Sequence, residues 1–371
     1  MKPNSLKQLR TLGQSFWLNY IRRDLLVSGE LRRLIEEDGL RGMTSNPAIF
    51  EKAIVKSHAY DADIRNLAAQ GKDARDIYEA LSQQDVQSAA DEFLPLYDRT
   101  DGRDGYVSLE VSPRMAHDTK GTIAEARRLW AALKRPNVLI NVPATTESLP
   151  AIQQLICDGI NVNVTMLFEL SRYRQVVDVY MTGLEMRLAE GRSVQRVASV
   201  ASFFLSRMDT IVDSLLEKLI AQDGASGKIA TKVHGQVAIS SAKLAYQIYK
   251  EIFSGERFNK LNAHGARVQR LLWASTDTKN PDYSDIKYVA ALIGPDTINT
   301  LPTETLNAFR DHGYPKPTLE QHVKEAAWVI QQLSELGIRI PQMTQRLEDE
   351  GVEKYNQAFD KLMGSLADRL R

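Results

Sequence analysis

Short apolar runs alternate along the chain with longer segments of mixed polarity. The runs are bounded by turn residues and are too short to be core helices, so we expect them to be buried strands. They cover residues 107–111, 138–142, 162–168, 197–204, 271–274 and 288–293. Two more strands are expected near the start of the chain, at residues 14–21 and 39–43.

The segments between the runs have the period of amphipathic helices. One helix is expected before Gly191, which stands where a C′ glycine would end it. Its apolar face is formed by Val177, Tyr180, Met181, Leu184 and Leu188. Another helix is expected over residues 319–333, with Gly337 following it.

Strands and helices in alternation indicate a parallel sheet with right-handed crossovers, and eight such units close a barrel. We therefore predict an α/β protein of the (β/α)8 TIM-barrel class. Residues 1–371 are expected to form a single domain, because no Pro/Gly/Ser-rich linker, low-complexity tract or repeat divides them. Residues 315–371 are amphipathic and are expected to form a helical tail packed on the barrel.

Charge and cysteine content narrow the functional classes. The chain has 47 lysine and arginine residues and 47 aspartate and glutamate residues, so its formal net charge is zero. This balance gives no indication of binding to nucleic acid or to an anionic membrane. Cys157 is the single cysteine, which excludes an intrachain disulfide and favours a reducing cytoplasm. We expect no signal peptide, membrane span or cofactor, and a small molecule as the binding partner.

In a barrel of this class, the carboxyl ends of the strands build the site. Glu110 is the strongest candidate, because a buried carboxylate must be paired or hydrogen-bonded; a structural salt bridge is the alternative. Asn163 and Thr165 either contact a ligand or are hydrogen-bonded strand residues. Arg207 and Lys279 follow the sixth and seventh strands and suit a phosphate group, or are solvated surface charges.

Histidine spacing gives no sign of a metal-dependent site. The six histidines do not converge at the expected strand ends, so no metal ligands are predicted; they are His58, His117, His234, His264, His312 and His322. His117 follows the third strand and is interpreted as structural.

Three segments resemble the transaldolase family, especially its longer bacterial subgroup. They are Asp38 to Pro47, Val142 to Thr145 and Gly159 to Leu167, and the similarity runs from about Ser15 to Leu366. The resemblance implies a pentose phosphate pathway transferase that moves a dihydroxyacetone unit from sedoheptulose 7-phosphate to glyceraldehyde 3-phosphate. In that family a lysine on the fourth strand forms an imine with the sugar.

The resemblance also assigns roles to residues of this chain. Glu110 and Thr165 match the groups that transfer protons with a water molecule, and Arg207 matches a phosphate ligand. The other implied substrate contacts are Thr44, Asn46, Asn163, Ser202, Phe204, Ser275 and Lys279.

Two departures from the family pattern stand at its catalytic centre. Asn141 occupies the position of the imine-forming lysine, and Asn19 that of an aspartate on the first strand. An amide nitrogen is not basic and cannot form an imine. Losing one partner of a buried ion pair costs about 3–5 kcal/mol, so the paired change indicates natural divergence rather than an engineered trap. Smaller departures are Ser148, Glu169 and Asp277.

These departures leave several functions open. The first is a diverged enzyme in which Glu110 and Thr165 move protons on a sugar phosphate or related polyol without a covalent intermediate. The second is an inactive sugar-phosphate-binding pseudoenzyme, or an inactivated variant of a true transaldolase. The third is transaldolase activity through Lys279, the only amine expected near the strand ends. A metal-dependent aldolase is the fourth.

Overall fold

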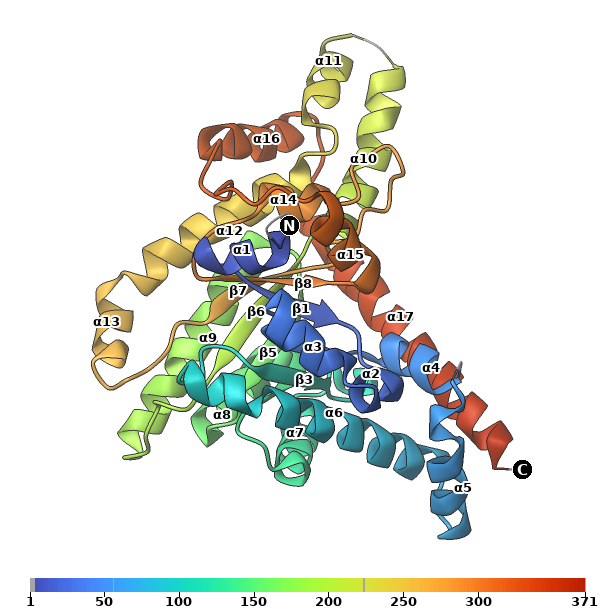
Figure 1. Ribbon diagram of the computed structural model, residues 1–371. Coiled ribbons are helices and arrows are strands. Elements are labelled where there is room, and N and C mark those ends of the chain that lie inside the picture. Colours follow the sequence, from blue (N-terminus) through green and yellow to red (C-terminus); the bar gives the residue numbers. More distant parts are fainter. Residues whose placement is uncertain (1–3, 56, 223, 371) are drawn as a thin grey trace.

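The computed structural model describes residues 4–55, 57–222 and 224–370, and its centre is a closed barrel of eight parallel strands (Figure 1). Each strand pairs with the next along the chain, and β8 closes the barrel on β1. The predicted (β/α)8 class is therefore confirmed. The strands are β1 Ser15–Asn19, β2 Gly42–Thr44, β3 Tyr106–Glu110, β4 Val138–Pro143, β5 Val162–Leu167, β6 Ser199–Phe204, β7 Arg270–Ala274 and β8 Thr297–Leu301.

One predicted strand is wrong. Residues 288–293 do not form the eighth strand, because most of this run lies in the helix α14 Lys287–Ala291. A short apolar run without turn residues can be helix or strand, and sequence period alone does not separate them. The true β8 carries buried polar residues, including Thr297 and Thr300, which hydrogen-bond to neighbouring side chains instead of forming an apolar run.

Helices connect the strands and surround the barrel (Figure 1). In the first half of the chain they are α1 Ser5–Thr11, α2 Arg23–Val27, α3 Glu30–Arg33, the π-helix η1 Leu34–Asp38, α4 Pro47–Val55, the 3-10 helix η2 His58–Tyr60, α5 Asp61–Ala69, α6 Ala74–Arg99, the 3-10 helix η3 Pro113–Met115, α7 Thr119–Leu133, the 3-10 helix η4 Thr146–Ser148 and α8 Leu149–Asp158. They continue with α9 Leu170–Ala189, α10 Ser206–Ala221, α11 Gly224–Val233, α12 Val237–Phe253, α13 Glu256–Asn262, α14, α15 Thr303–His312, α16 Val323–Glu335 and α17 Ile340–Arg369.

The two helices expected from periodicity are present. The helix before Gly191 is α9, and Gly191 has the left-handed φ of 71° that suits a glycine after a helix end. The second helix, α16, begins at Val323, later than predicted. Leu319 is fully buried but lies in a turn before this helix.

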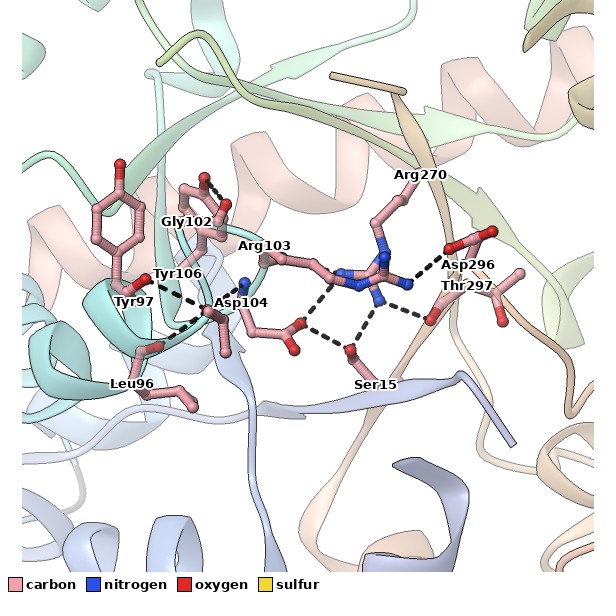
Figure 2. A network of polar contacts seen from close by, with 11 residues as sticks. Ser15, Leu96, Tyr97, Gly102, Arg103, Asp104, Tyr106, Arg270, Asp296 and Thr297 are labelled. Carbon is pink, nitrogen blue, oxygen red and sulfur yellow. Dashed lines mark hydrogen bonds and ion pairs between the residues drawn. The ribbon is translucent and has the colours of Figure 1, made fainter. Parts of the chain in front are cut away.

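A buried ion pair occupies the amino-terminal end of the barrel (Figure 2). Arg270 begins β7 and donates hydrogen bonds to Asp104 Oδ1 at 3.0 Å and to Ser15 Oγ at 2.7 Å. It also donates to the carbonyl oxygens of Arg103 and Thr297, each at 3.0 Å. These contacts connect the first residues of β1, β7 and β8 to the loop before β3. One guanidinium therefore links four segments at the amino-terminal end of the barrel, called the barrel floor below.

The carboxyl-terminal helix α17 crosses the opposite end of the barrel. It packs against α4, α6 and α10, beside α4 in Figure 1. Gly351 makes this approach possible, because a Cβ at that position would lie 2.7 Å from Met166 Cε on β5. One helical turn further on, Tyr355 reaches the cavity at the strand ends. The tail is therefore part of the site's wall.

The Arg270 network yields a stability prediction. We expect Arg270→Met to lower the free energy of unfolding by about 3–5 kcal/mol, because Asp104 would remain buried without its partner. Urea denaturation would measure the change. Arg32→Met is the matched control: Arg32 is 65% exposed and pairs with Glu92, so its loss should cost about 0–1 kcal/mol. Equal losses for the two variants would show that the ion pair does not hold the barrel floor.

Candidate functional site

A cavity of about 280 Å³ opens at the carboxyl ends of the strands. Every site residue predicted from the sequence lines it. These residues are Asn19, Thr44, Asn46, Glu110, Asn141, Asn163, Thr165, Ser202, Phe204, Arg207, Ser275 and Lys279. The structure thus brings together residues from seven of the eight strands or the segments that follow them.

Strand register explains why these side chains meet. Glu110 of β3 is the register partner of Asn141 on β4, and Asn141 is the partner of Asn163 on β5. Asn19 and Thr44 are partners on β1 and β2 in the same way. Neighbouring strands lie about 4.8 Å apart, so partners on one face form a continuous layer of polar side chains inside the barrel.

The two asparagines lie at the centre of this layer. The Asn141 side-chain amide donates to the carbonyl oxygen of Ser45 at 3.2 Å, while its Oδ1 is buried and has no partner within the described residues. Asn19 Oδ1 accepts from Thr44 Oγ1 at 3.1 Å, and Thr44 Oγ1 lies 2.8 Å from Thr300 Oγ1. The centre is therefore a neutral hydrogen-bonding surface, with one buried acceptor left free for a ligand.

Glu110 is the carboxyl group of the layer. Burial raises the pKa of Glu110 well above its ordinary value, and the positive charge of Arg207 opposes this shift. Burial also raises the pKa of Tyr355, and the nearby Glu110 carboxylate adds to that effect. A raised pKa makes the Glu110 carboxylate a stronger base than an ordinary glutamate, which suits a group that transfers protons.

The end of β5 departs from regular strand geometry. Its register against β6 shifts between Val164 and Leu167, and Met166 has a positive φ of 57°. Such conformations cost about 1–3 kcal/mol and gather at functional sites. The irregular segment carries Thr165 into the cavity that also contains Glu110.

The other side of the cavity carries the features of an anion site. The Arg207 guanidinium lies 5.7 Å from the centre of the Phe204 ring, and Ser275 Oγ lies 2.9 Å from Ser206 Oγ. Ser275 is also strained, with a φ of 53°. Lys279 is ion-paired with Asp277, which lines the cavity too. Arg207 has no ion-pair partner within the described chain, so it is the stronger of the two predicted anion ligands.

Several residues of the cavity wall were not predicted from the sequence. Lys52 of α4 lines it, so the prediction that Lys279 is the only nearby amine is wrong. The spacing of Ala48, Ile49 and Lys52 on one helical face could have revealed this lysine. No local signal could have revealed Tyr355, because its position depends on where α17 crosses the barrel. Ser45, Thr300 and Pro302 were missed as well.

The histidines stay apart from the cavity. Across residues 4–55, 57–222 and 224–370, the structure contains no cluster of three or more His, Cys, Asp or Glu side chains that could hold a metal ion. His117 lies at the surface, with Nδ1 3.2 Å from Glu147 Oε2. No helix of the described chain is long and apolar enough to cross a membrane.

The fold and the cavity define a (β/α)8-barrel protein with a carboxyl group of raised pKa, Glu110, and an arginine without an ion-pair partner among the described residues, Arg207, at the strand ends. The model of the transaldolase/fructose-6-phosphate aldolase family matches residues 16–366, and the chain belongs to this family. The resemblance seen in the sequence motifs is therefore confirmed at the level of the family.

Curated relatives are similar over nearly their full lengths. A transaldolase of Thiobacillus denitrificans is 47% identical over 363 residues, covering 98% of this chain and 99% of the relative. Transaldolase 2 of Nostoc sp. PCC 7120 is 46% identical, covering 100% and 99%. A transaldolase of Mycobacterium tuberculosis is 43% identical, covering 97% and 95%.

The raised pKa of Glu110 predicts a pH dependence of stability. Because the folded state binds this proton more tightly than the unfolded chain, the resulting stabilisation is present at low pH and is lost as pH rises through the folded pKa. We expect the free energy of unfolding of the unmodified protein to fall, relative to that of Glu110→Gln, as pH rises above the ordinary glutamate pKa of about 4.3. Urea titrations at several pH values would measure this difference. Glu353→Gln, on the exposed face of α17, controls for the loss of one charge, and an identical trend in both variants would contradict the prediction.

Proposed function

We propose that this protein is a diverged transaldolase-like enzyme that moves protons on a phosphorylated sugar or related polyol without a covalent intermediate. One observation carries the proposal: Glu110, with its raised pKa, and Thr165 line the same cavity as Asn141, which stands where the family's imine-forming lysine is expected. The acid–base groups are present, and the nucleophile of the family is not.

The cavity supports chemistry next to a sugar carbonyl. The Glu110 carboxylate takes a proton from the carbon beside the carbonyl, and the electron pair moves onto the carbonyl oxygen as an enediolate. Side-chain amides of Asn141 and Asn163 donate hydrogen bonds to that oxygen. Glu110 then returns the proton to the neighbouring carbon, with Thr165 holding a water that exchanges the hydroxyl proton. The net reaction is an isomerisation and needs no oxidant or second substrate.

The two amines of the cavity do not replace the missing lysine in this proposal. Lys279 is engaged by Asp277, and Lys52 is exposed on α4 rather than buried within the strand layer. An imine-forming lysine needs surroundings that lower its pKa, which buried apolar or cationic neighbours provide. We assign both lysines, with Arg207, to holding the anionic end of the substrate.

The single buried cysteine, Cys157, fits a reducing compartment, so we propose that the protein works in the cytoplasm.

Hydrogen exchange on the substrate tests the catalytic role of Glu110. The protein is incubated with fructose 6-phosphate or sedoheptulose 7-phosphate in D2O, and NMR follows deuterium entering carbon-bound positions and the growth of any new sugar phosphate. Glu110→Gln should slow exchange by about 10²–10⁴-fold, because the general base is gone. Glu353→Gln should leave the rate unchanged. Binding without exchange in the unmodified protein would identify a pseudoenzyme, and full exchange in Glu110→Gln would remove Glu110 from the mechanism.

Borohydride trapping tests the absence of covalent chemistry. We expect no mass increase when the unmodified protein is reduced in the presence of fructose 6-phosphate, since Asn141 cannot form an imine. The double variant Asn19→Asp with Asn141→Lys should form the adduct, which shows that the cavity still holds the sugar. An adduct on the unmodified protein would overturn the proposal, and peptide mapping would then locate it at Lys52 or Lys279.

A further inference from the structure

Arg41 is a largely buried arginine whose side chain has no hydrogen-bonded partner within the described residues. It lies just before β2, only 7% of its surface is exposed, and its guanidinium has no hydrogen bond or ion pair within the described residues. Arg270 shows the usual arrangement: it is equally buried and is surrounded by Asp104, Ser15 and two carbonyl oxygens (Figure 2). Unpaired buried charges are costly, so each one requires an explanation.

Asp104 does not supply the missing partner. It is close enough for its charge to favour the protonated Arg41, but the hydrogen bonds to its carboxylate come from Arg270 and Ser15. Burial is the largest influence on Arg41 and lowers its pKa; the nearby Arg10 guanidinium also lowers it. Arg41 Nε is therefore buried without a partner, in surroundings where Arg10 and Arg99 oppose the positive charge of Arg41 and Asp104 favours it.

Arg41 lines a cavity of about 720 Å³ between α1, η1 and the end of α6. The cations Lys7, Arg10 and Arg99 line it as well, against one carboxylate, that of Glu36. None of these four cations forms a hydrogen bond or ion pair through its side chain within residues 4–55, 57–222 and 224–370. Elsewhere on this protein most arginines are paired with carboxylates, so an unpaired group around one cavity is a distinct feature of its surface.

Helix dipoles explain the positions of only two of the four cations that line this cavity. Arg10 and Arg99 lie in the last turns of α1 and α6, where the carbonyl ends of helices favour positive charge. Arg41 does not end a helix, because it sits between η1 and β2. Its burial beside other cations is explained if an anion enters the cavity and binds all of them.

We propose that this cavity is a second ligand site, and that it binds a small molecule carrying two linked or closely spaced phosphate groups. The planar fork of Arg41 suits bidentate contact with one phosphate, and Lys7, Arg10 and Arg99 surround a second. A polyvalent anion is favoured over a single carboxylate, because the lining carries three more positive than negative charges. The site opens at the amino-terminal side of β2, and the catalytic cavity lies at the other end of that strand.

Calorimetric titration with inorganic pyrophosphate tests the proposal. Arg41→Met and Arg10→Gln should each weaken binding by about tenfold or more, since each removes a charged hydrogen-bond donor. Arg10 is exposed, so its variant keeps the test valid if Arg41→Met fails to fold. Glu36→Gln should tighten binding severalfold, because it removes the opposing carboxylate. Arg32→Gln, an equally exposed arginine outside the cavity, should change nothing.

The catalytic cavity must be separated from this site. Titrations are repeated in Arg207→Ala, where the catalytic anion ligand is missing, and pyrophosphate affinity should be unchanged. Fructose 1,6-bisphosphate and ADP are then titrated to distinguish a sugar bisphosphate from a nucleotide as the source of the two phosphates. Absence of pyrophosphate binding would overturn the proposal. So would binding that survives Arg41→Met and Arg10→Gln, or that is lost in Arg207→Ala.

Discussion

Closure of the barrel is the constraint on which the rest of the structure depends. Once Ser15–Leu18 of β1 pairs with Ile298–Leu301 of β8, inward-facing side chains from all eight strands converge on one axis. Buried polar side chains at those positions need hydrogen-bond partners, which neighbouring strands or a ligand can provide. The two ends of the axis meet this demand differently. At the amino-terminal end Arg270 and Asp104 compensate each other, whereas at the carboxyl-terminal end Asn141 keeps an acceptor without a partner.

The amino-terminal end of the barrel, with its ion pair, therefore stabilises the fold. The carboxyl-terminal end, with its unpaired acceptor, is the end that can bind a ligand. In a network whose charges are balanced, such as that of Arg270 and Asp104, little electrostatic energy is left for a ligand, although Arg270 Nε itself has no partner. A network with an unpaired buried atom, such as Asn141 Oδ1, is less stable by the free energy of the missing hydrogen bond. A ligand that forms this hydrogen bond recovers that free energy on binding. Met166 and Ser275, which both have positive φ angles, lie at this carboxyl-terminal end, although loops at the amino-terminal end also contain such residues, among them Asp296. Asparagine in place of charged residues keeps the layer polar without leaving a buried charge.

Much of this could be predicted from the sequence, for physical reasons that particular residues make clear. Seven strands and cavity residues such as Glu110 and Thr165 could be predicted from the pattern of the chain, because in a parallel barrel the position of a side chain along its strand fixes which end it faces. Others, such as Asn19, were indicated by the resemblance to the family. The eighth strand was missed because Thr297 and Thr300 are polar residues buried by tertiary contacts, which no local pattern records. Lys52 and Tyr355 were missed for a related reason: their roles depend on how α4 and α17 cross the strand ends. The unpaired state of Arg41 is likewise visible only in three dimensions, although the residue lies within a motif that indicated the family.

The placement of α17 has a consequence for how the protein is made. All eight strands are present once residue 301 has been synthesised, so the barrel can close while the ribosome still holds the rest of the chain. Tyr355 and the helix that carries it arrive last, and only then does the cavity have its full wall. The segment that completes the wall of the cavity is therefore the last to be synthesised, after every strand that carries a residue of the polar layer.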